Sequence, residues 1–441
     1  MFGTSGIRGP VGDEVTADLA LSVGRALGVD ADRVVVGRDA RESGRLLVDA
    51  LAAGLRESGT DVVDLGLAAT PTVARAVAPR DADAGVAVTA SHNPPADNGI
   101  KLWQPSGQAY DAEMRETVAE RVRDGAAALE PWDGLGDRVS RDATAGHVAA
   151  LVEALDLAEP LSVVVDVGNG AGGVTVEALQ ALGCAVETLN AQPDGSFPGR
   201  PSEPTAGNCT SLSALVRESD ADLGIAHDGD ADRTRAVTAD GEFLSGDVLL
   251  AILAMDAAEP GDSVAAPVDT SLAVDDYLAG ADVSVTRTRV GDVSVAARAS
   301  EPGVAFGGEP SGAWIWPDET LCPDGPLAAC RLVALASERP LAERAREVDD
   351  YPIRRDSVET DAKAAVMERV TGRVTDEYDD VSTLDGVRVD LGDAWFLLRA
   401  SGTQPLVRVT AQARDEGRAD AVFAEARDIV DRAREDASAD G

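Results

Sequence analysis

The chain has 441 residues, a formal net charge of −39 and an isoelectric point near 4.3, and its length exceeds one ordinary hydrophobic core, so several domains are expected. Such acidity is typical of disordered chains, but apolar residues make up 44% of this chain and recur in strand and helix patterns, which excludes disorder. The acidic excess instead favours adaptation to a halophilic cytoplasm, where molar salt shortens the Debye length to about 3 Å and screens the repulsion between like charges. The chain lacks a basic face, a signal peptide and an apolar stretch of spanning length, so we expect a cytoplasmic protein with no nucleic-acid or membrane partner.

The first third of the chain alternates strand and helix patterns. Residues 33–37 and 61–66 are strand-like apolar runs, and residues 44–58 have the apolar periodicity of a helix. A further helix begins near Pro71. This alternation predicts an α/β domain that ends near residue 145.

The segment TASHNPP, which contains Ser91, follows the apolar run of residues 85–88, a predicted buried strand. Its two prolines stop regular structure, so Ser91 is expected on a rigid, exposed turn at the end of that strand, where open α/β sheets place ligands. We interpret the Ser91 hydroxyl as a nucleophile or phosphate carrier, and His92 as a phosphate donor or proton carrier. An ordinary turn is the alternative, because Ser, Asn and Pro all favour turns.

Lysine occurs only twice, at Lys101 and Lys363, so arginine carries nearly all of the positive charge. Lys101 lies shortly after the Ser91 segment. An ammonium can shift its pKa and exchange protons where a guanidinium cannot. We therefore predict a functional Lys101, with chance retention as the alternative.

The second unit contains a strand-like run at residues 161–166, followed by the sequence GNGAGG at residues 168–173. This sequence satisfies the Gly-x-Gly-x-x-Gly dinucleotide pattern, and Glu187 lies where a ribose-binding acid would lie. A nicotinamide-dependent oxidoreductase is therefore a remote alternative. The fingerprint alone is weak, and we favour a tight strand-to-helix turn.

The segment HDGDADR follows a short apolar strand and carries Asp228, Asp230 and Asp232 at alternate positions. Carboxylates spaced in this way can converge on one hard cation, and oxygen ligands suit Mg²⁺ or Ca²⁺ rather than zinc. A calcium loop of the EF-hand type needs Gly and Glu where this chain has Arg233 and Ala239, so that alternative fails. A guanidinium directly after the triplet suits a bound phosphate.

Two later loops carry polar groups on flexible backbone. The segment FGGEPSG places Glu309 and Ser311 on a Gly-rich turn suited to sugar hydroxyls. The segment RASGTQP, which begins at Arg399, offers a guanidinium, two hydroxyls and exposed backbone, which together make an anion cradle.

These four loops, with the opening GTSGIRG at residues 3–9, resemble the α-D-phosphohexomutase superfamily of phosphoglucomutase, phosphomannomutase and phosphoglucosamine mutase. The loops occur in the family's order and spacing, and the similarity covers essentially the whole length. The resemblance implies an α/β fold class: three similar α/β domains with mixed sheets and a small C-terminal α+β domain around a central cleft. The expected domains are residues 1–145, 146–246, 247–350 and 351–441.

The resemblance also implies a phosphoserine enzyme that converts a hexose phosphate through a hexose bisphosphate. One Mg²⁺ per chain is implied, held by the three aspartates and a phosphate oxygen on the serine. The implied catalytic residues are Ser91, Lys101, Arg8 and His92, the metal ligands are Ser91, Asp228, Asp230 and Asp232, and the substrate-binding residues are Arg233, Glu309, Ser311, Arg399, Ser401, Gly402, Thr403 and Arg408.

The short opening and the Glu309–Ser311 loop most resemble archaeal, and in particular haloarchaeal, phosphoglucosamine mutases, so glucosamine 6-phosphate and glucosamine 1-phosphate are the expected pair. The single carboxylate of Glu309 cannot distinguish hexoses that differ in the substituent at carbon 2. A phosphoglucomutase or phosphomannomutase is therefore the alternative. A sugar-phosphate binder without catalysis is disfavoured, because the carrier serine and all three aspartates are present. A monomer or homodimer is expected.

Two positions depart from the family pattern. Ala313 stands where many relatives carry His, and Gln404 stands where Glu is commoner. The role of that His must be absent or supplied by Lys101, His92 or another group. The four cysteines form no Cys-x-x-Cys pair, so we expect free thiols and no structural zinc.

Overall fold

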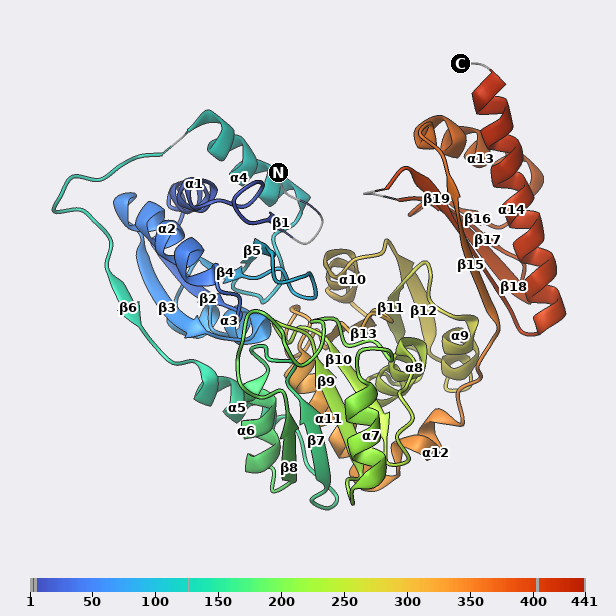
Figure 1. Ribbon diagram of the computed structural model, residues 1–441, viewed down its shortest axis with the longest axis horizontal. Helices are drawn as coiled ribbons and strands as arrows, with labels where there is room; N and C mark the ends of the chain where they lie inside the picture. Colours follow the sequence, from blue (N-terminus) through green and yellow to red (C-terminus); the bar gives the residue numbers. More distant parts are fainter. Residues whose placement is uncertain (1–2, 4–5, 126, 402–403, 440–441) are drawn as a thin grey trace.

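The computed structural model describes the chain except for residues 1–2, 4–5, 126, 402–403 and 440–441. Along the described residues, four β-sheets with their helices follow one another in chain order (Figure 1). Three of them are mixed sheets in α/β domains and the fourth is antiparallel, which confirms the predicted fold class. No helix in this part of the chain combines the length and apolarity needed to cross a bilayer.

The first domain has a mixed sheet in the order β1-β5-β4-β2-β3-β6. Val34 and Val36 of β2 enter one apolar cluster and Val35 enters another, so both faces of the strand are covered. This double burial explains the continuous apolar runs that the sequence shows. The elements are β1 (Ile7–Pro10), α1 (Ala17–Leu27), β2 (Arg33–Arg38), α2 (Gly44–Glu57), β3 (Asp61–Leu67), α3 (Thr70–Arg75), the 3₁₀ helix η1 (Ala78–Arg80), β4 (Ala84–Val88), β5 (Asp97–Trp103), α4 (Ala112–Asp124) and β6 (Arg138–Ser140).

The second and third domains have separate sheets, in the orders β10-β9-β7-β8 and β12-β11-β13-β14. One continuous apolar core nevertheless spans both, from Val163 and Leu179 to Leu250 and Leu332. The second domain contains α5 (Thr144–Glu153), β7 (Ser162–Asp166), α6 (Gly173–Ala181), β8 (Ala185–Leu189), α7 (Thr210–Glu218), β9 (Leu223–His227) and β10 (Thr234–Thr238). The third contains α8 (Gly246–Ala257), β11 (Ser263–Pro267), α9 (Leu272–Ala279), β12 (Ser284–Thr288), α10 (Asp292–Ala299), β13 (Val304–Gly308), β14 (Trp314–Ile315), α11 (Gly325–Glu338) and α12 (Leu341–Ala345).

The fourth domain has an antiparallel sheet in the order β15-β19-β18-β17-β16. Helices α13 and α14 pack on one face of this sheet, and Trp395 and Leu397 of the other face pack against Val268 and Leu272 of the third domain. In Figure 1 the first and fourth domains lie on opposite sides, with the other two between them. The elements are β15 (Ile353–Glu359), α13 (Lys363–Glu377), β16 (Val381–Ser382), β17 (Val387–Asp390), β18 (Ala394–Ala400), β19 (Leu406–Ala413) and α14 (Glu416–Ala439).

The four polar loops of the sequence all follow the C-terminal ends of strands. The Ser91 loop follows β4, the aspartate loop follows β9, the Glu309 loop follows β13 and the Ser401 loop follows β18. In open α/β sheets this is the edge where ligands bind. The fold therefore supplies one loop from each domain.

Candidate active site

Ser91 occupies a left-handed backbone position, with φ of 52°, directly after β4. Its hydroxyl donates a hydrogen bond to Oδ2 of Asp228 at 2.7 Å, and its amide donates to Oγ1 of Thr89 at 2.8 Å. The residue is only 1% exposed, so the prediction of an exposed turn was wrong. The cause is a contact between domains: the second domain covers the turn, and the Ser202 hydroxyl donates to the Ser91 carbonyl at 2.9 Å.

Arg41 donates hydrogen bonds to the backbone of the Ser91 loop, a contact that the sequence pattern did not predict. This guanidinium is fully buried and donates to the backbone carbonyls of Ser91 at 2.9 Å, Asn93 at 2.7 Å, Asp97 at 2.8 Å and Pro94. A planar group with five donors suits this task, since no single neutral side chain could reach four carbonyls. Arg41 therefore contributes most of the side-chain hydrogen bonds to the backbone carbonyls of this loop.

Asp39 in turn fixes Arg41 and the start of the loop. It accepts from Nε of Arg41 at 2.9 Å and from the Thr89 hydroxyl at 2.7 Å. Burial raises the pKa of Asp39 to about 6, although Arg41 and Thr89 act in the opposite direction. The available sequence signal was an Asp-x-Arg that begins two residues after the predicted strand of residues 33–37, at the same edge of the sheet as Ser91.

The carboxylates of Asp228, Asp230 and Asp232, here called the acidic triad, are buried and offer oxygens that all lie within 4.8 Å of one another. Ala231 allows the loop to curl through a left-handed position, with φ of 54°. The Oδ1 atom of Asp230 is a buried acceptor without a hydrogen-bond partner in the described structure. Converging oxygens and an unused buried acceptor fit a hard divalent cation such as Mg²⁺.

Lys101 on β5 lies against the acidic triad. Its ammonium donates to Asp230 at 2.8 Å and to Asp232, while the hydroxyl of Thr70 also donates to Asp230 at 2.6 Å. Burial opposes the charge of Lys101, but the two carboxylates outweigh burial and raise its pKa. Burial first, and then the neighbouring carboxylates, raise the pKa of Asp228. One ammonium therefore compensates only part of the negative charge of the triad.

A cavity of about 210 Å³ brings the first three loops together. In this cavity Nδ1 of His92 lies 3.3 Å from the Ser91 hydroxyl, and burial together with Arg233, Arg8 and Lys101 lowers the His92 pKa to about 3. The Nε atom of Arg8 is buried and has no acceptor among the described residues, as expected for a group that binds an anion. The predicted site residues that line this cavity are Arg8, Ser91, His92, Asp232, Arg233, Glu309 and Ser311, and Ala313 lines it as well.

Glu309 faces the same cavity. The amide of Gly291 donates to its Oε1 at 2.7 Å, and the Ser311 hydroxyl lies 3.5 Å from its Oε2. Burial raises the pKa of Glu309 to about 7, and the charge of Asp292 acts in the same direction. The group therefore changes charge near neutral pH, and it has acceptor capacity left for a ligand.

The fourth domain contributes a separate cavity of about 430 Å³. Arg399 is paired in register with Arg408, and Arg355 is paired with Thr410, so the three guanidinium groups share one face of the sheet. Arg355 was missed because only strand register places it there. Ser401 is buried, and its hydroxyl accepts from the amide of Gln404, which lines this cavity, at 3.2 Å, whereas Gly402 and Thr403 lie outside the described residues.

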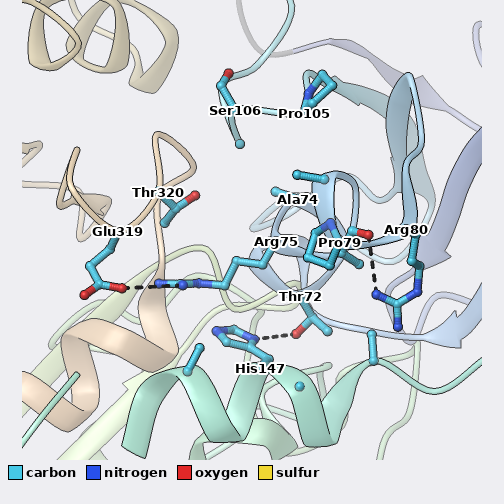
Figure 2. Close-up of a pocket in the computed structure, with 16 residues that line it drawn as sticks. Thr72, Ala74, Arg75, Pro79, Arg80, Pro105, Ser106, His147, Glu319 and Thr320 are labelled. Atoms are coloured by element: carbon cyan, nitrogen blue, oxygen red, sulfur yellow. Dashed lines mark hydrogen bonds and ion pairs between the residues drawn. The ribbon is translucent and has the colours of Figure 1, made fainter. Parts of the chain in front are cut away.

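A third cavity, of about 460 Å³, lies at the junction of the first three domains (Figure 2). Two pairs of its polar groups bond across domains: the Thr72 hydroxyl lies 2.8 Å from Nδ1 of His147, and Arg75 lies 3.7 Å from Glu319. The Nη2 atom of Arg75 is buried without a hydrogen-bond partner in the described structure. None of the predicted site residues that the structure describes line this cavity.

The glycines of residues 168–173 form a tight turn between β7 and α6, as the sequence favours. A Cβ atom on Gly170 would lie 2.5 Å from the Gly229 carbonyl oxygen, and the amide of Ala171 donates to that oxygen at 3.0 Å. Gly170 therefore allows the turn to pack against the loop of the acidic triad, and Gly168 occupies a left-handed backbone position with φ of 62°. A Cβ atom on Gly173 would meet no atom within 4 Å, so packing accounts for only part of the Gly-x-Gly-x-x-Gly pattern.

Family models of phosphoglucomutase/phosphomannomutase match four consecutive stretches: α/β/α domains I, II and III at residues 1–128, 145–241 and 245–351, and the C-terminal domain at residues 354–429. A probable phosphoglucosamine mutase of Methanopyrus kandleri is 46% identical over 99% of this chain and 98% of its own length. One of Methanococcoides burtonii is 44% identical over 98% of each chain. A solved phosphoglucomutase/phosphomannomutase family protein of Burkholderia thailandensis is 30% identical, covers 99% of this chain and 98% of its own, and has a TM-score of 0.87.

We predict that Arg41→Met lowers the free energy of unfolding by about 3–5 kcal/mol, because it leaves Asp39 buried and unpaired. Urea denaturation measures this loss. Arg45→Met is the matched control: Arg45 is exposed on α2, so its loss should change the free energy of unfolding by no more than about 0.5 kcal/mol. Equal effects of the two substitutions would contradict the role given to Arg41.

Proposed function

The chain belongs to the phosphoglucomutase/phosphomannomutase family, and we propose that it is a phosphohexomutase that interconverts glucosamine 6-phosphate and glucosamine 1-phosphate. The observation that carries the proposal is the meeting of Ser91 with the acidic triad. The 2.7 Å hydrogen bond from the Ser91 hydroxyl to Asp228 joins a nucleophile on the first domain to a cation site on the second. The cavity beside them has a volume of about 210 Å³, and polar side chains that suit the hydroxyls of a sugar line it.

Ser91 is the proposed carrier of the phosphoryl group. In the first half of the reaction the Oγ–P bond of phosphorylated Ser91 breaks, a bond forms from phosphorus to a free substrate hydroxyl, and that hydroxyl loses its proton. We assign the exchange of this proton to Nδ1 of His92, which lies 3.3 Å from the Ser91 hydroxyl, and the ammonium of Lys101 adds positive charge nearby. His92 shares the cavity with Ala313, so it is our proposed substitute for the histidine that many relatives carry.

The acidic triad and an oxygen on phosphorylated Ser91 are the proposed ligands of one Mg²⁺. When bound, this ion would stabilise the negative charge of the transferring phosphoryl group. The residues of the chain supply the rest: Arg8 and Arg233 bind phosphate oxygens, and the buried walls exclude water.

The remaining phosphate of the substrate is assigned to the face of the fourth domain that carries Arg355, Arg399 and Arg408. Three guanidinium groups on one face suit a dianion, and the acidity of the rest of the chain increases the need for them. Glu309 and Ser311 are assigned to the sugar hydroxyls between the two phosphate positions. The bisphosphate intermediate would turn over within this space before its second phosphate returns to Ser91.

The preference for glucosamine rests on the names of the two archaeal relatives and on the small, polar Ser311, which leaves room for an ammonium. An ammonium offers a charge-assisted hydrogen bond where a hydroxyl offers a neutral one. We expect roughly ten- to a hundred-fold discrimination against the 1-phosphates of glucose and mannose. A higher kcat/KM for either of those substrates would move the assignment to a phosphoglucomutase or phosphomannomutase.

Ser91→Ala should abolish turnover, with kcat falling by at least about a thousandfold, because the phosphoryl carrier is gone. Intact-mass analysis should show a phosphorylated fraction in the wild type and none in the variant. Ser202→Ala removes a neighbouring hydroxyl that bonds the Ser91 carbonyl and serves as the control, with phosphorylation retained. Full activity of Ser91→Ala would refute the phosphoserine mechanism.

Asp230→Asn should lower kcat by about a hundredfold or more while the melting temperature changes little. An amide oxygen can still accept from Lys101 and Thr70, so the local contacts persist while a cation ligand loses its charge. Chelation should inactivate the wild type, and Mg²⁺ should restore it better than zinc. Undiminished turnover after chelation would exclude the metal site.

KM should fall as pH rises through about 7, because Glu309 is protonated below this pKa and becomes a charged, stronger hydrogen-bond acceptor above it. Substrate phosphate also ionises, near pH 6, so both effects must be separated. In Glu309→Gln the change in KM near pH 7 should vanish, and the change in KM near pH 6 should remain. The same pH profile in both proteins would show that Glu309 does not bind the sugar.

A further inference from the structure

Arg235 is the second residue of β10 and has no part in the mechanism above. Its Nη1 atom donates to the backbone carbonyl of Pro310, and its Nη2 atom donates to the carbonyl of Leu244 at 3.4 Å. The central carbon of the guanidinium lies 5.2 Å from the centroid of the Phe243 ring. Arg235 is therefore held by the segment that follows its own strand, and it reaches a loop of the third domain.

Charge pairing does not explain this arginine. Acidic residues outnumber Lys and Arg by 78 to 39, yet both hydrogen bonds of Arg235 within the described residues go to backbone carbonyls. Burial lowers its pKa to about 10, although the charge of Asp247 acts in the opposite direction, so the group stays charged at neutral pH. A half-buried cation costs free energy unless it is hydrogen-bonded, so the two carbonyls account for its place in the fold.

Pro310 lies between Glu309 and Ser311, the residues assigned to the sugar hydroxyls. The amide of Gly312 donates to the Glu309 carbonyl at 2.9 Å and closes this turn. Proline has no amide hydrogen, so the carbonyl is the only backbone group through which Pro310 can be held. Arg235 supplies the donor for that carbonyl.

The same carbonyl lies against the start of α8. A Cβ atom on Gly246 would overlap the Pro310 carbonyl oxygen and would lie 2.6 Å from Nη1 of Arg235. A side chain at residue 246 would therefore displace one or both of these groups. Two separate elements, β10 and α8, thus fix the position of the Pro310 carbonyl.

Strand β10 also connects this loop to the acidic triad, because it begins two residues after Asp232. The amide of Thr234 donates to the Gly312 carbonyl at 2.9 Å, and the next residue, Arg235, donates to the Pro310 carbonyl. Two consecutive residues of β10 therefore bond the backbone on both sides of Ser311. The strand that leaves the cation site holds the loop that faces the sugar.

We propose that Arg235 is a positioning residue that holds Glu309 and Ser311 in the place where they bind the sugar. This inference rests on the proposed function, which assigns those two residues to the sugar hydroxyls. A carboxylate and a hydroxyl recognise a sugar only at hydrogen-bond distance, and a displacement of about 1 Å is enough to weaken such contacts severely. Loss of Arg235 should therefore weaken substrate binding more than it slows the transfer of the phosphoryl group.

The test compares Arg235→Met, Arg235→Lys and the matched control Arg344→Met. Arg344 lies on α12 and donates to the Leu335 carbonyl at 3.2 and 3.3 Å, so its substitution removes the same charge and a similar bond away from the loop. Arg235→Met should raise KM for glucosamine 6-phosphate by about tenfold and change kcat by less than about threefold. Arg235→Lys keeps one donor for the carbonyl and should recover part of the affinity, and the control should match the wild type.

A double-mutant cycle separates positioning from a general loss of structure. In the Glu309→Gln background, Arg235→Met should raise KM by less than about threefold, because the carboxylate through which Arg235 acts is already gone. A larger factor in that background would overturn the inference, and so would a KM within about twofold of the wild type for Arg235→Met alone.

Hydrogen exchange of the substrate-free protein keeps the inference separate from the proposed function. The peptide of residues 304–316 should exchange faster in Arg235→Met than in the wild type or in Arg344→Met, because the loop has lost a hydrogen bond that holds it. If the wild type turns over no hexose phosphate, the proposed function fails, and this comparison still decides whether Arg235 holds the loop. Equal exchange in the three proteins would show that it does not.

Discussion

Three buried carboxylates within reach of one another are the constraint on which the site depends. Like charges in a low-dielectric interior must be compensated, and the second domain that carries the acidic triad does not compensate them alone. The first domain supplies the partners: Lys101, the Thr70 hydroxyl and the Ser91 hydroxyl all donate to the triad. The contacts that partly compensate the triad therefore also bring Ser91 to the proposed cation site.

The overall acidity of the chain makes the distribution of its cations informative. With a net charge of −39, an anionic substrate meets long-range repulsion, and local positive charge must overcome it. Arg8 and Arg233 line the cavity beside Ser91, while Arg355, Arg399 and Arg408 share one face of the fourth domain. Two separated groups of arginines suit the proposed bisphosphate intermediate, which has a phosphate at each end.

Hydrogen bonds and close packing also hold the backbone of the loops in place. Arg41 donates to the backbone carbonyls of Ser91, Asn93, Pro94 and Asp97, and Gly170 lets the turn after β7 pack closely against the loop of the acidic triad. These contacts fix the backbone on both sides of the hydrogen bond between Ser91 and Asp228.

Local patterns in the sequence were sufficient for the first strands and for the chemistry of the loops, because strand burial and ligand type depend on neighbouring residues. The four-domain architecture and the set of site residues came from the family resemblance, which did not indicate Val290, Gly291 or Asp292 of the Ser91 cavity. Tertiary structure alone decided that Ser91 is buried, that the second and third domains share a core, that Arg41 reaches the Ser91 loop and that Arg355 lies with Arg399 and Arg408 on one face of the fourth domain. These contacts join residues that are 50 or more positions apart, or depend on strand register, so no local pattern contains them.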